Sequence, residues 1–503
     1  MKIRQFLTVG FLFAFFISCG ENDKAEEIPQ IDERDNLTVT ENILIPSYEG
    51  NGVQWGGYDV LQSWTGSPTL SDSDWDKLFE RVSFMSPGLV RIMIAPGWNY
   101  EINGVYDPSK SEDVLFRILD YCEENNVNVI LGEWGHVGGD DIDEEWLNNS
   151  IRFLEHLVNA RNYTCIKYYN MVNEPNGDWS SIDGNYALWS DLIARYHAAM
   201  QEKDLDQQVG MIGPDVAVWG TDLVSWVSRT VTDLDDRMAA YDIHTYPSET
   251  EVRSGDYKDM ISAYRNAAPM QKPMFMGEVG FKYPAGSELG QENQRRIDAD
   301  PYASDDSNMF IYDSFYGIDM ADVVMQNMLA GYAGVIVWGL DDAQYNIDGG
   351  GSTELKRWGF WNILGEEKFE NPDDESIRPW FYTMSLMSKY FPAGTRIFEV
   401  DLPEKKGLRA IAGEKDGHYT IAIVNSHFGE YTVQVGSENA TDLMGLKMYE
   451  FVAGDGASFE GAVDEKGFAV PDQTGVDFSF SGGQREEVIV APRSFKLFTN
   501  MPD

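Results

Sequence analysis

The sequence predicts an α/β chain, a TIM-type (β/α)8 barrel followed by an all-β sandwich, and three observations support this fold class. Eight short apolar runs alternate with amphipathic segments between residues 53 and 392. Two of the runs end in a glutamate, Glu174 and Glu278, where such barrels place functional groups. After residue 393 the pattern changes to short alternating runs separated by Gly, Asp and Asn, which is typical of a sandwich.

The first half of the barrel consists of four predicted strand and helix pairs. Strands are expected at 53–58, 89–95, 127–133 and 166–174. The first helix begins near Ser73, since Trp75, Leu78, Phe79 and Val82 follow the i, i+3, i+4, i+7 spacing of a buried helical face. Further helices are expected at 112–125, 144–160 and 186–203.

The second half supplies strands five to eight and the two longest connections. The strands are expected at 209–213, 240–244, 273–278 and 334–338. An open doubly wound sheet would more often have five or six strands and a Gly-rich phosphate turn after the first, which this sequence lacks. The polar stretches 282–308 and 341–373 are expected to be long loops over the carboxyl ends of the strands.

Both ends of the chain contribute predicted strands outside the barrel. The C-terminal runs lie at 397–400, 408–412, 419–425, 431–435, 446–451, 478–481, 487–491 and 495–499. The alternation from Asn36 to Pro46 predicts a further strand, a candidate to pair with that C-terminal sheet. We therefore divide the chain into a signal segment, a tether with its leading strand, the barrel and the sandwich, at 1–19, 20–40, 41–392 and 393–503.

The net charge of −45 and the pI near 4.3 limit the kinds of partner. Nucleic acids and polyanionic glycans would be repelled at long range, whereas a neutral glycan does not feel that field. A plain solubility role for the acidic surface is the alternative.

The N-terminus reads as a targeting segment. Lys2 and Arg4 precede an apolar run, 6–17, which is too short to span a bilayer. The following Ser18-Cys19-Gly20 resembles a bacterial lipobox, and this resemblance implies that Cys19 is lipidated and anchors the chain to a membrane of the cell envelope. A plain secretory signal is the alternative. The acidic stretch 21–34 is expected to be a flexible tether.

Two other cysteines, Cys122 and Cys165, fall in a predicted helix and at a predicted strand start. We expect two buried thiols, and a disulfide stays open as an alternative. The sequence contains no cysteine and histidine spacing typical of a zinc site, so no metal and no cofactor is expected.

The two strand-end glutamates are 104 residues apart (278 minus 174), which leaves room for three βα units of about 30 to 35 residues between them. Asn173-Glu174-Pro175 and the apolar stretch ending in Gly277-Glu278 resemble the signatures of clan A retaining glycoside hydrolases, the cellulase-like (β/α)8 barrels. The resemblance implies that Glu174 is the acid/base and Glu278 the nucleophile. Each glutamate taken singly is also compatible with a solvated strand end.

Neighbouring residues match the same clan pattern. The resemblance implies that Asn173 binds the sugar 2-hydroxyl and that Arg91 holds Glu278 ionised. It also implies that Tyr246 orients the nucleophile and that His244 lines the subsite where the bond breaks. Trp338 would be the floor on which the sugar stacks. The alternatives are an arginine paired with a structural acid, a core histidine and a barrel-packing tryptophan.

Strand three departs from the clan pattern, because it ends in Glu133 and Trp134 while His136 is displaced from the position where a histidine is common. All three are candidates for contact with the substrate, and Glu133 is also a candidate partner of Arg91. Aromatic residues after other strand ends are candidates for outer sugar subsites: Trp98, Trp179, Trp219, Tyr345, Trp358 and Trp361.

The expected function is that of a lipid-anchored, retaining glycoside hydrolase acting on a neutral β-linked glycan. A β-glucan is the first expectation, followed by mannan, xylan or galactan. A non-catalytic glycan-binding lipoprotein is an alternative, and a transglycosylase that uses the same site is another.

Overall fold

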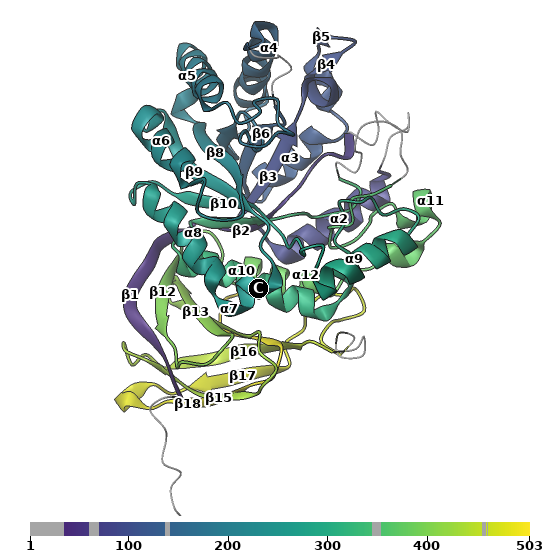
Figure 1. Cartoon of the computed structure of the whole chain (residues 1–503). Coiled ribbons are helices and arrows are strands. Elements are labelled where there is room, and N and C mark those ends of the chain that lie inside the picture. The colour runs from purple at the N-terminus through teal and green to yellow at the C-terminus, as the bar shows by residue number, and fades with distance from the viewer. Residues whose placement is uncertain (1–34, 60–69, 136–140, 345–353, 455–458, 460) are drawn as a thin grey trace, which may run out of the picture.

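The computed structural model describes residues 35–59, 70–135, 141–344, 354–454, 459 and 461–503, and it places a barrel above a β-sheet domain (Figure 1). The predicted signal segment with Cys19 and most of the predicted tether lie outside the described residues, as do His136 and Tyr345. No described helix is both long and apolar enough to cross a membrane.

The barrel is closed by eight parallel strands in the order β10-β11-β2-β3-β6-β7-β8-β9. This confirms the predicted fold class and the number of strands. In chain order the strands are β2 (Gly50–Gln54), β3 (Leu89–Ile94), β6 (Asn128–Glu133), β7 (Ile166–Asn170), β8 (Gly210–Val218), β9 (Met238–Thr245), β10 (Met274–Val279) and β11 (Gly334–Val337).

The lower barrel interior is filled by one layer of apolar side chains. Because side chains alternate along a strand, the inward residue above Leu89 in β3 is Arg91, and the one above Ile130 in β6 is Gly132. The layer beneath the site is therefore apolar, and the polar groups gather at the carboxyl ends of the strands. The layer consists of Leu89, Ile130, Ile212, Ala240, Phe275, Ala333 and Ile336, with Tyr168 packed against it.

Helices surround the barrel and pack their apolar faces on its outside (Figure 1). Helix α2 follows Ser71, whose side chain forms a capping box with Asp74, as expected for a start near Ser73. The longer helices are α2 (Asp72–Met85), α3 (Leu115–Glu124), α4 (Glu144–Glu155), α5 (Tyr186–Glu202), α6 (Val224–Leu234), α8 (Asp256–Ala267), α10 (Ser314–Leu329) and α12 (Trp380–Lys389), with a short α7 (Glu249–Ser254).

The two stretches expected to be loops contain helices, so that expectation was wrong in part. Helix α9 (Glu288–Ala299) lies within 282–308, and α11 (Gly365–Phe369) lies within 341–373. The buried residues of α9 are Gly290 and Ile297 alone. A helix that is this exposed has no apolar stripe, and the periodicity on which the prediction rested was therefore absent.

Several predicted strands differ in their bounds. Strand β2 covers Gly50–Gln54, whereas 53–58 was predicted. Strand β7 ends at Asn170 instead of Glu174, because Glu174 lies in a left-handed turn with φ 47°. Strand β8 continues through Pro214 and Asp215 to Val218, beyond the predicted end at Gly213. Strand β17 (Gln473–Phe478) precedes the predicted run 478–481, because its side chains are largely exposed and polar.

The second domain is a sheet of nine strands that folds over its own apolar core, the expected sandwich. Strand β1 (Asn36–Tyr48) pairs antiparallel with β12 and parallel with β15, which confirms that the leading strand joins this sheet, although our division at residue 41 falls inside it. The other strands are β12 (Thr395–Asp401), β13 (Leu408–Lys415), β14 (His418–Asn425), β15 (Tyr431–Ser437), β16 (Leu443–Val452), β17, β18 (Glu486–Val490) and β19 (Ser494–Thr499).

Cys122 and Cys165 are both buried free thiols, as expected, and they form no disulfide. Burial raises the pKa of Cys122 well above its ordinary value. The thiols therefore serve as small apolar side chains in the packing outside the barrel.

Candidate active site

Arg91 lies at the centre of the polar end of the barrel and is fully buried. One guanidinium nitrogen, Nη1, donates to Gln54 Oε1 and to Glu278 Oε2, each at 3.1 Å. The other, Nη2, donates to Asn173 Oδ1 and to Asp215 Oδ2, each at 2.9 Å. Arg91 thus pairs with Glu278, as the resemblance implied, and with a second carboxylate that the sequence analysis did not include.

Glu278 is turned into the barrel by an irregularity in β10. Met276 pairs with Ile243 and Glu278 with His244, so Gly277 is the extra residue of a bulge. A Cβ at Gly277 would lie 3.1 Å from His244 Nε2, and this close approach favours glycine. The bulge therefore directs the Glu278 carboxylate toward Arg91.

The ionisation of Glu278 is set by opposing effects. Burial raises its pKa, and nearby Glu174 raises it further, while His244, Arg91 and the hydroxyl of Tyr246 lower it; the net shift is upward. The Tyr246 hydroxyl donates a hydrogen bond to Glu278 Oε1. The cations and this donor thus offset part of the desolvation cost of a carboxylate in the barrel.

Glu174 faces Glu278 from the turn after β7. Its Oε1 is 3.1 Å from His244 Nδ1, and its Oε2 accepts a hydrogen bond of 2.7 Å from Trp179 Nε1. Carboxylate oxygens of Glu174 and Glu278 lie within 4.8 Å of each other. Retaining hydrolysis needs its two carboxyl groups about 5 to 5.5 Å apart, and this spacing agrees with that requirement.

His244 lies between Glu174 and Asp215 and contacts both carboxyl groups. It is fully buried, and its Nε2 lies 2.7 Å from Asp215 Oδ1. Burial lowers the pKa of His244, but Asp215 and Glu278 more than offset this and raise the pKa to about 10. The imidazole is therefore protonated at neutral pH and donates from Nε2 to Asp215 and from Nδ1 to Glu174.

Asp215 and Asp242 are site residues that the sequence analysis missed. Asp215 is the bulged residue of β8, with φ 59°, and it is bonded to both Arg91 and His244. Burial raises the pKa of Asp215, but these two cations hold it well below its ordinary value. Its neighbour Pro214 is a residue type typical of turns, and the predicted strand 209–213 stops before both residues.

Asp242 lies beside this pair. Its Oδ1 accepts from the Asp215 backbone N–H at 2.9 Å, and its Oδ2 is buried and has no partner among the described residues. Burial, followed by repulsion from Asp215, raises the pKa of Asp242 well above its ordinary value. Its position two residues before His244 places both on the inner face of β9, a signal that was available in the sequence.

The prediction that Glu133 contacts the substrate or Arg91 is wrong. It is the last residue of β6 and faces the helices, because the inward positions of that strand are Ile130 and Gly132. Its carboxyl accepts hydrogen bonds from Tyr100 at 2.9 Å and Ser150 at 3.0 Å, and it contacts neither the cavity nor Arg91. Burial raises the pKa of Glu133 to about 7.

A cavity of about 710 Å³ opens above the two glutamates. Among the predicted substrate contacts, Asn173, Tyr246, Trp338 and Trp134 line it, whereas Arg91 and His244 are fully buried and do not. Buried Trp361 does not, since its Nε1 donates to Asp341 Oδ2 at 2.9 Å. The aromatic side chains of the cavity wall are Trp98, Trp134, Trp179, Trp219, Tyr246, Trp338 and Trp358.

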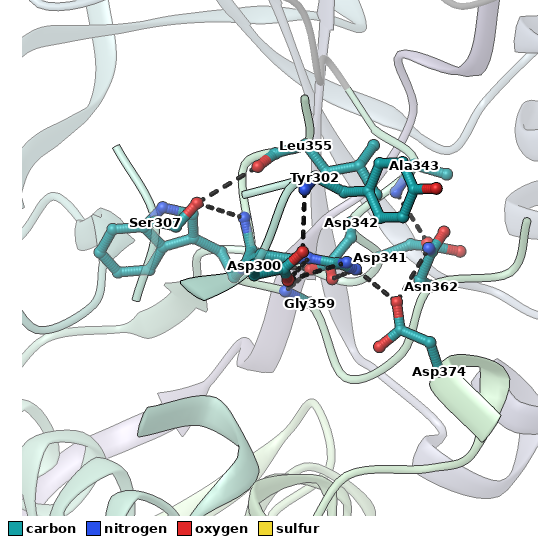
Figure 2. Close-up of polar contacts among 12 residues, drawn as sticks. Asp300, Tyr302, Ser307, Asp341, Asp342, Ala343, Leu355, Gly359, Asn362 and Asp374 are labelled. Carbon is teal, nitrogen blue, oxygen red and sulfur yellow. Dashed lines mark hydrogen bonds and ion pairs between the residues drawn. The ribbon is translucent and has the colours of Figure 1, made fainter. Parts of the chain in front are cut away.

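One wall of the cavity is held by a buried ionic cluster (Figure 2). Asp342 Oδ1 accepts the backbone N–H groups of Trp358 at 2.9 Å and Gly359 at 2.7 Å. Asp342 Oδ2 accepts from Arg378 at 2.6 Å and Arg357 at 3.3 Å. The Trp358 ring, edge-on to Tyr246 at 5.6 Å, is therefore fixed through its own backbone.

Two groups of side chains have their ligand atoms close enough to share a cation, Glu174 with His244 and Glu278, and Asp215 with Asp242 and His244. The protonated imidazole of His244 offers no lone pair, and the guanidinium of Arg91 already pairs with both Asp215 and Glu278. This donor set does not fit a divalent metal ion.

No family model matches the sequence, and no curated protein matches it. Solved structures do match. A glycoside hydrolase family 30 subfamily 8 xylanase from Clostridium acetobutylicum has a TM-score of 0.59 and 14% identity, over 92% of this chain and 99% of that one. A family 51 α-L-arabinofuranosidase from Bifidobacterium longum has a TM-score of 0.63 and 11% identity, over 92% and 99%. An endo-β1,6-glucanase has a TM-score of 0.59 and 14% identity, over 93% and 94%.

The fold is that of these glycoside hydrolases. At such identities the likeness shows the fold of both domains together, because nearly the full length of each chain is covered. The three proteins are named for three different glycan bonds, so a substrate for this chain has to be argued from its own site.

Proposed function

We propose that this chain is a retaining glycoside hydrolase that cleaves β-linked bonds of a neutral oligosaccharide or polysaccharide. The observation that carries the proposal is the pair Glu174 and Glu278, whose carboxylate oxygens lie within 4.8 Å of each other in the wall of an aromatic cavity.

In the first step Glu278 attacks the anomeric carbon and forms a glycosyl ester, while Glu174 gives its proton to the departing glycosidic oxygen. In the second step Glu174 takes a proton from water, the hydroxide oxygen bonds to the anomeric carbon, and the ester bond to Glu278 breaks. The products are two shorter sugars, and the anomeric configuration is retained.

The surrounding groups support these two roles. Arg91 and Tyr246 hold Glu278 by one oxygen each, which fixes the attacking carboxylate. Asn173 is held by Arg91 and lines the cavity, where its amide can bond the 2-hydroxyl. Trp338 offers an aromatic face beneath the sugar.

A neutral glycan is the proposed substrate class, with a β-glucan first and mannan, xylan or galactan next. The net charge of −45 opposes polyanions at long range, and a wall rich in indole rings suits the apolar faces of neutral sugars. A transglycosylase would use the same intermediate and differ only in the acceptor, sugar instead of water. A glycan-binding protein without activity is the second alternative.

The test is a product profile on β-glucan, mannan, xylan and galactan, together with aryl β-glycosides and an aryl α-L-arabinofuranoside. A 2-fluoro glycoside inhibitor should add one glycosyl group to Glu278, as detected by peptide mass spectrometry. Glu278→Ala should lose activity by about 10⁴-fold or more, by analogy with removal of other covalent nucleophiles. Intact activity of Glu278→Ala, or labelling of another residue, would reject the assignment.

We also propose that Cys19 is lipidated and anchors the chain to the bacterial cell envelope. The support is the apolar run before Cys19 and the polar stretch between it and β1. In a bacterial host, labelled fatty acid should be incorporated into the wild-type chain and not into Cys19→Ala. Equal incorporation in both would reject the anchor, and release of an unlabelled wild-type chain into the medium would favour a plain secretory signal.

A further inference from the structure

Both oxygens of the Glu174 carboxyl group already accept hydrogen bonds. Oε1 faces the protonated imidazole of His244 at 3.1 Å, and Oε2 accepts the indole N–H of Trp179 at 2.7 Å. An indole nitrogen can only donate, so Oε2 must be an acceptor while this bond exists. The glycosidic oxygen must approach one of these two oxygens, so the two donors compete with it for space at the carboxyl group.

Trp179 is the partner that can leave. His244 is fully buried and bonded to Asp215, whereas the side chain of Trp179 is 57% exposed. Its ring lies directly over Gly177, where an added Cβ would come within 2.2 Å of ring carbon Cε2. The ring is thus seated on a glycine beside the turn that carries Glu174.

Trp219 lies next to Trp179 and is 51% exposed. The two rings meet edge to face at a centroid distance of 6.0 Å, and both line the cavity. Asn176 ties their segments together, since its side chain accepts the Ala217 N–H at 2.9 Å and donates to the Ala217 carbonyl at 2.8 Å. Two exposed indoles in a cavity carry an unfavourable apolar surface that a stacked sugar would cover.

The position of Trp179 and Trp219 in the cavity identifies which sugar of the substrate would stack on them. Glu278 attacks the sugar that becomes attached to the enzyme, and Glu174 protonates the oxygen of the sugar that leaves. Trp179 bonds to Glu174, and Trp219 packs beside Trp179. A sugar stacked on this pair is therefore the leaving group.

We propose that Trp179 and Trp219 form the binding subsite for the first sugar on the leaving-group side, and that Trp179 blocks the acid until this subsite is filled. This inference rests on the proposed hydrolase function. Without substrate, the Trp179 N–H occupies Oε2 of Glu174. When the leaving sugar stacks on the indoles, the ring withdraws, Glu174 carries at Oε2 a proton taken up from solvent, and the glycosidic oxygen accepts that proton. The chain then acts best on bonds with sugar on both sides.

The experiment compares two substrates cleaved by the wild-type chain, an oligosaccharide of the preferred glycan and the matching 2,4-dinitrophenyl glycoside. The aryl leaving group departs without a proton and carries no sugar to stack. For Trp179→Ala and for Trp219→Ala, we expect kcat/KM to fall on the oligosaccharide by about tenfold more than on the aryl glycoside, an effect of the size of one lost stacking contact.

Three further variants separate the parts of the proposal. Trp179→Phe keeps a ring and lacks the N–H, so we expect it to retain the wild-type ratio of the two kcat/KM values within about threefold. Gly177→Ala displaces the ring and should reduce the ratio as Trp179→Ala does. Phe428→Ala removes another aromatic ring, 77% exposed on the sandwich and outside this cavity, and should leave the ratio unchanged.

Each outcome decides one claim. Equal losses on both substrates, or none, in the two alanine variants would overturn the subsite. A loss in Trp179→Phe as large as that in Trp179→Ala would overturn the blocking role and assign the N–H to catalysis. Failure of the wild-type chain to cleave any substrate would instead reject the proposed function, which keeps the two failures distinguishable. Melting temperatures identify variants that are misfolded.

Discussion

At the level of single residues, the site is a balance of buried charges. Asp215 and Glu278 are paired with the cations Arg91 and His244. Such pairing is the condition under which charges are tolerated away from water.

The first prediction concerns Arg91. Replacing it with methionine leaves Asp215 and Glu278 without their shared cation, and we expect the free energy of unfolding to fall by about 3 to 5 kcal/mol. Activity should also be lost. Denaturant unfolding at neutral pH measures the first effect, and Arg91→Lys is the matched control, with an intermediate loss because a lysine keeps the charge and loses the fork of donors. Unchanged stability of Arg91→Met would contradict this account.

The second prediction concerns the pH dependence of stability at Glu133. Burial raises its pKa from the ordinary 4.5 to about 7, so the native state holds this proton more tightly than the unfolded state. The stability contributed by the protonated carboxyl is fully present below pH 4.5 and is lost as the pH rises through 7.

Glu133→Gln cannot ionise and should therefore gain stability relative to the wild type across that pH range, by at most about 3 kcal/mol at pH 8. Denaturant unfolding of both proteins at several pH values measures the difference. Stability profiles that run parallel from pH 4 to 8 would contradict the raised pKa.

At the level of elements, the cavity wall depends on the segments that follow β10 and β11. The Trp358 ring donates from Nε1 to the carbonyl of Asp306 at 2.6 Å, and the Arg357 carbonyl accepts from the Asn308 backbone at 2.9 Å. Arg357 also pairs with Asp300 at 3.1 Å (Figure 2 shows Asp300 beside this segment). The two segments are therefore held as one wall.

The third prediction tests that wall. Asp342→Asn removes the charge that faces Arg357 and Arg378, both buried, and leaves them with fewer carboxylates. We expect KM to rise more than kcat falls, because an amide NH2 placed against the two arginines displaces the segment that carries Trp358, while Glu174 and Glu278 are untouched. Steady-state kinetics on the preferred oligosaccharide measure this split.

Asp300→Asn is the matched control, since Asp300 is less buried and pairs with Arg357 alone among these arginines. It should show a smaller change in KM. A loss confined to kcat in Asp342→Asn would contradict a role in positioning the wall.

At the level of the whole molecule, helix α10 joins the barrel to the sandwich (Figure 1). It is buried on nearly all sides, and it carries two aspartates toward the second domain. Arg409 of β13 donates to both oxygens of Asp322, and Arg493 donates to Asp319 at 2.9 Å. The two domains therefore share a buried, charged interface.

The fourth prediction follows from this interface. Asp319→Ala leaves Arg493 and Arg253 without their shared carboxylate, and we expect the free energy of unfolding to fall by about 3 to 5 kcal/mol. Calorimetry should show one unfolding transition for the wild-type chain, because the domains stabilise each other. Two well-separated transitions in the wild type would contradict a shared interface.

Much of the fold was predictable because it depends on patterns local in the chain. The eight apolar runs of the barrel and the alternating apolar residues of the sandwich strands can be recognised in the sequence as regular hydrophobic patterns. Polar elements such as α9 and β17 were not, since little of their surface is buried and their residues need not alternate. Asp215 was missed for another local reason, because proline and aspartate in succession are typical of a turn.

The barrel and the sandwich could be recognised in the sequence, because apolar periodicity is a property of neighbouring residues, and Glu174 and Glu278 were singled out by motifs that resemble those of a known clan. Which polar groups lie beside these two glutamates became visible in the folded structure alone. The bulge at Gly277 turns Glu278 inward, while the alternation in β6 turns Glu133 outward. Such choices depend on how strands register against each other, and the energy of that register comes from contacts between residues far apart in the chain.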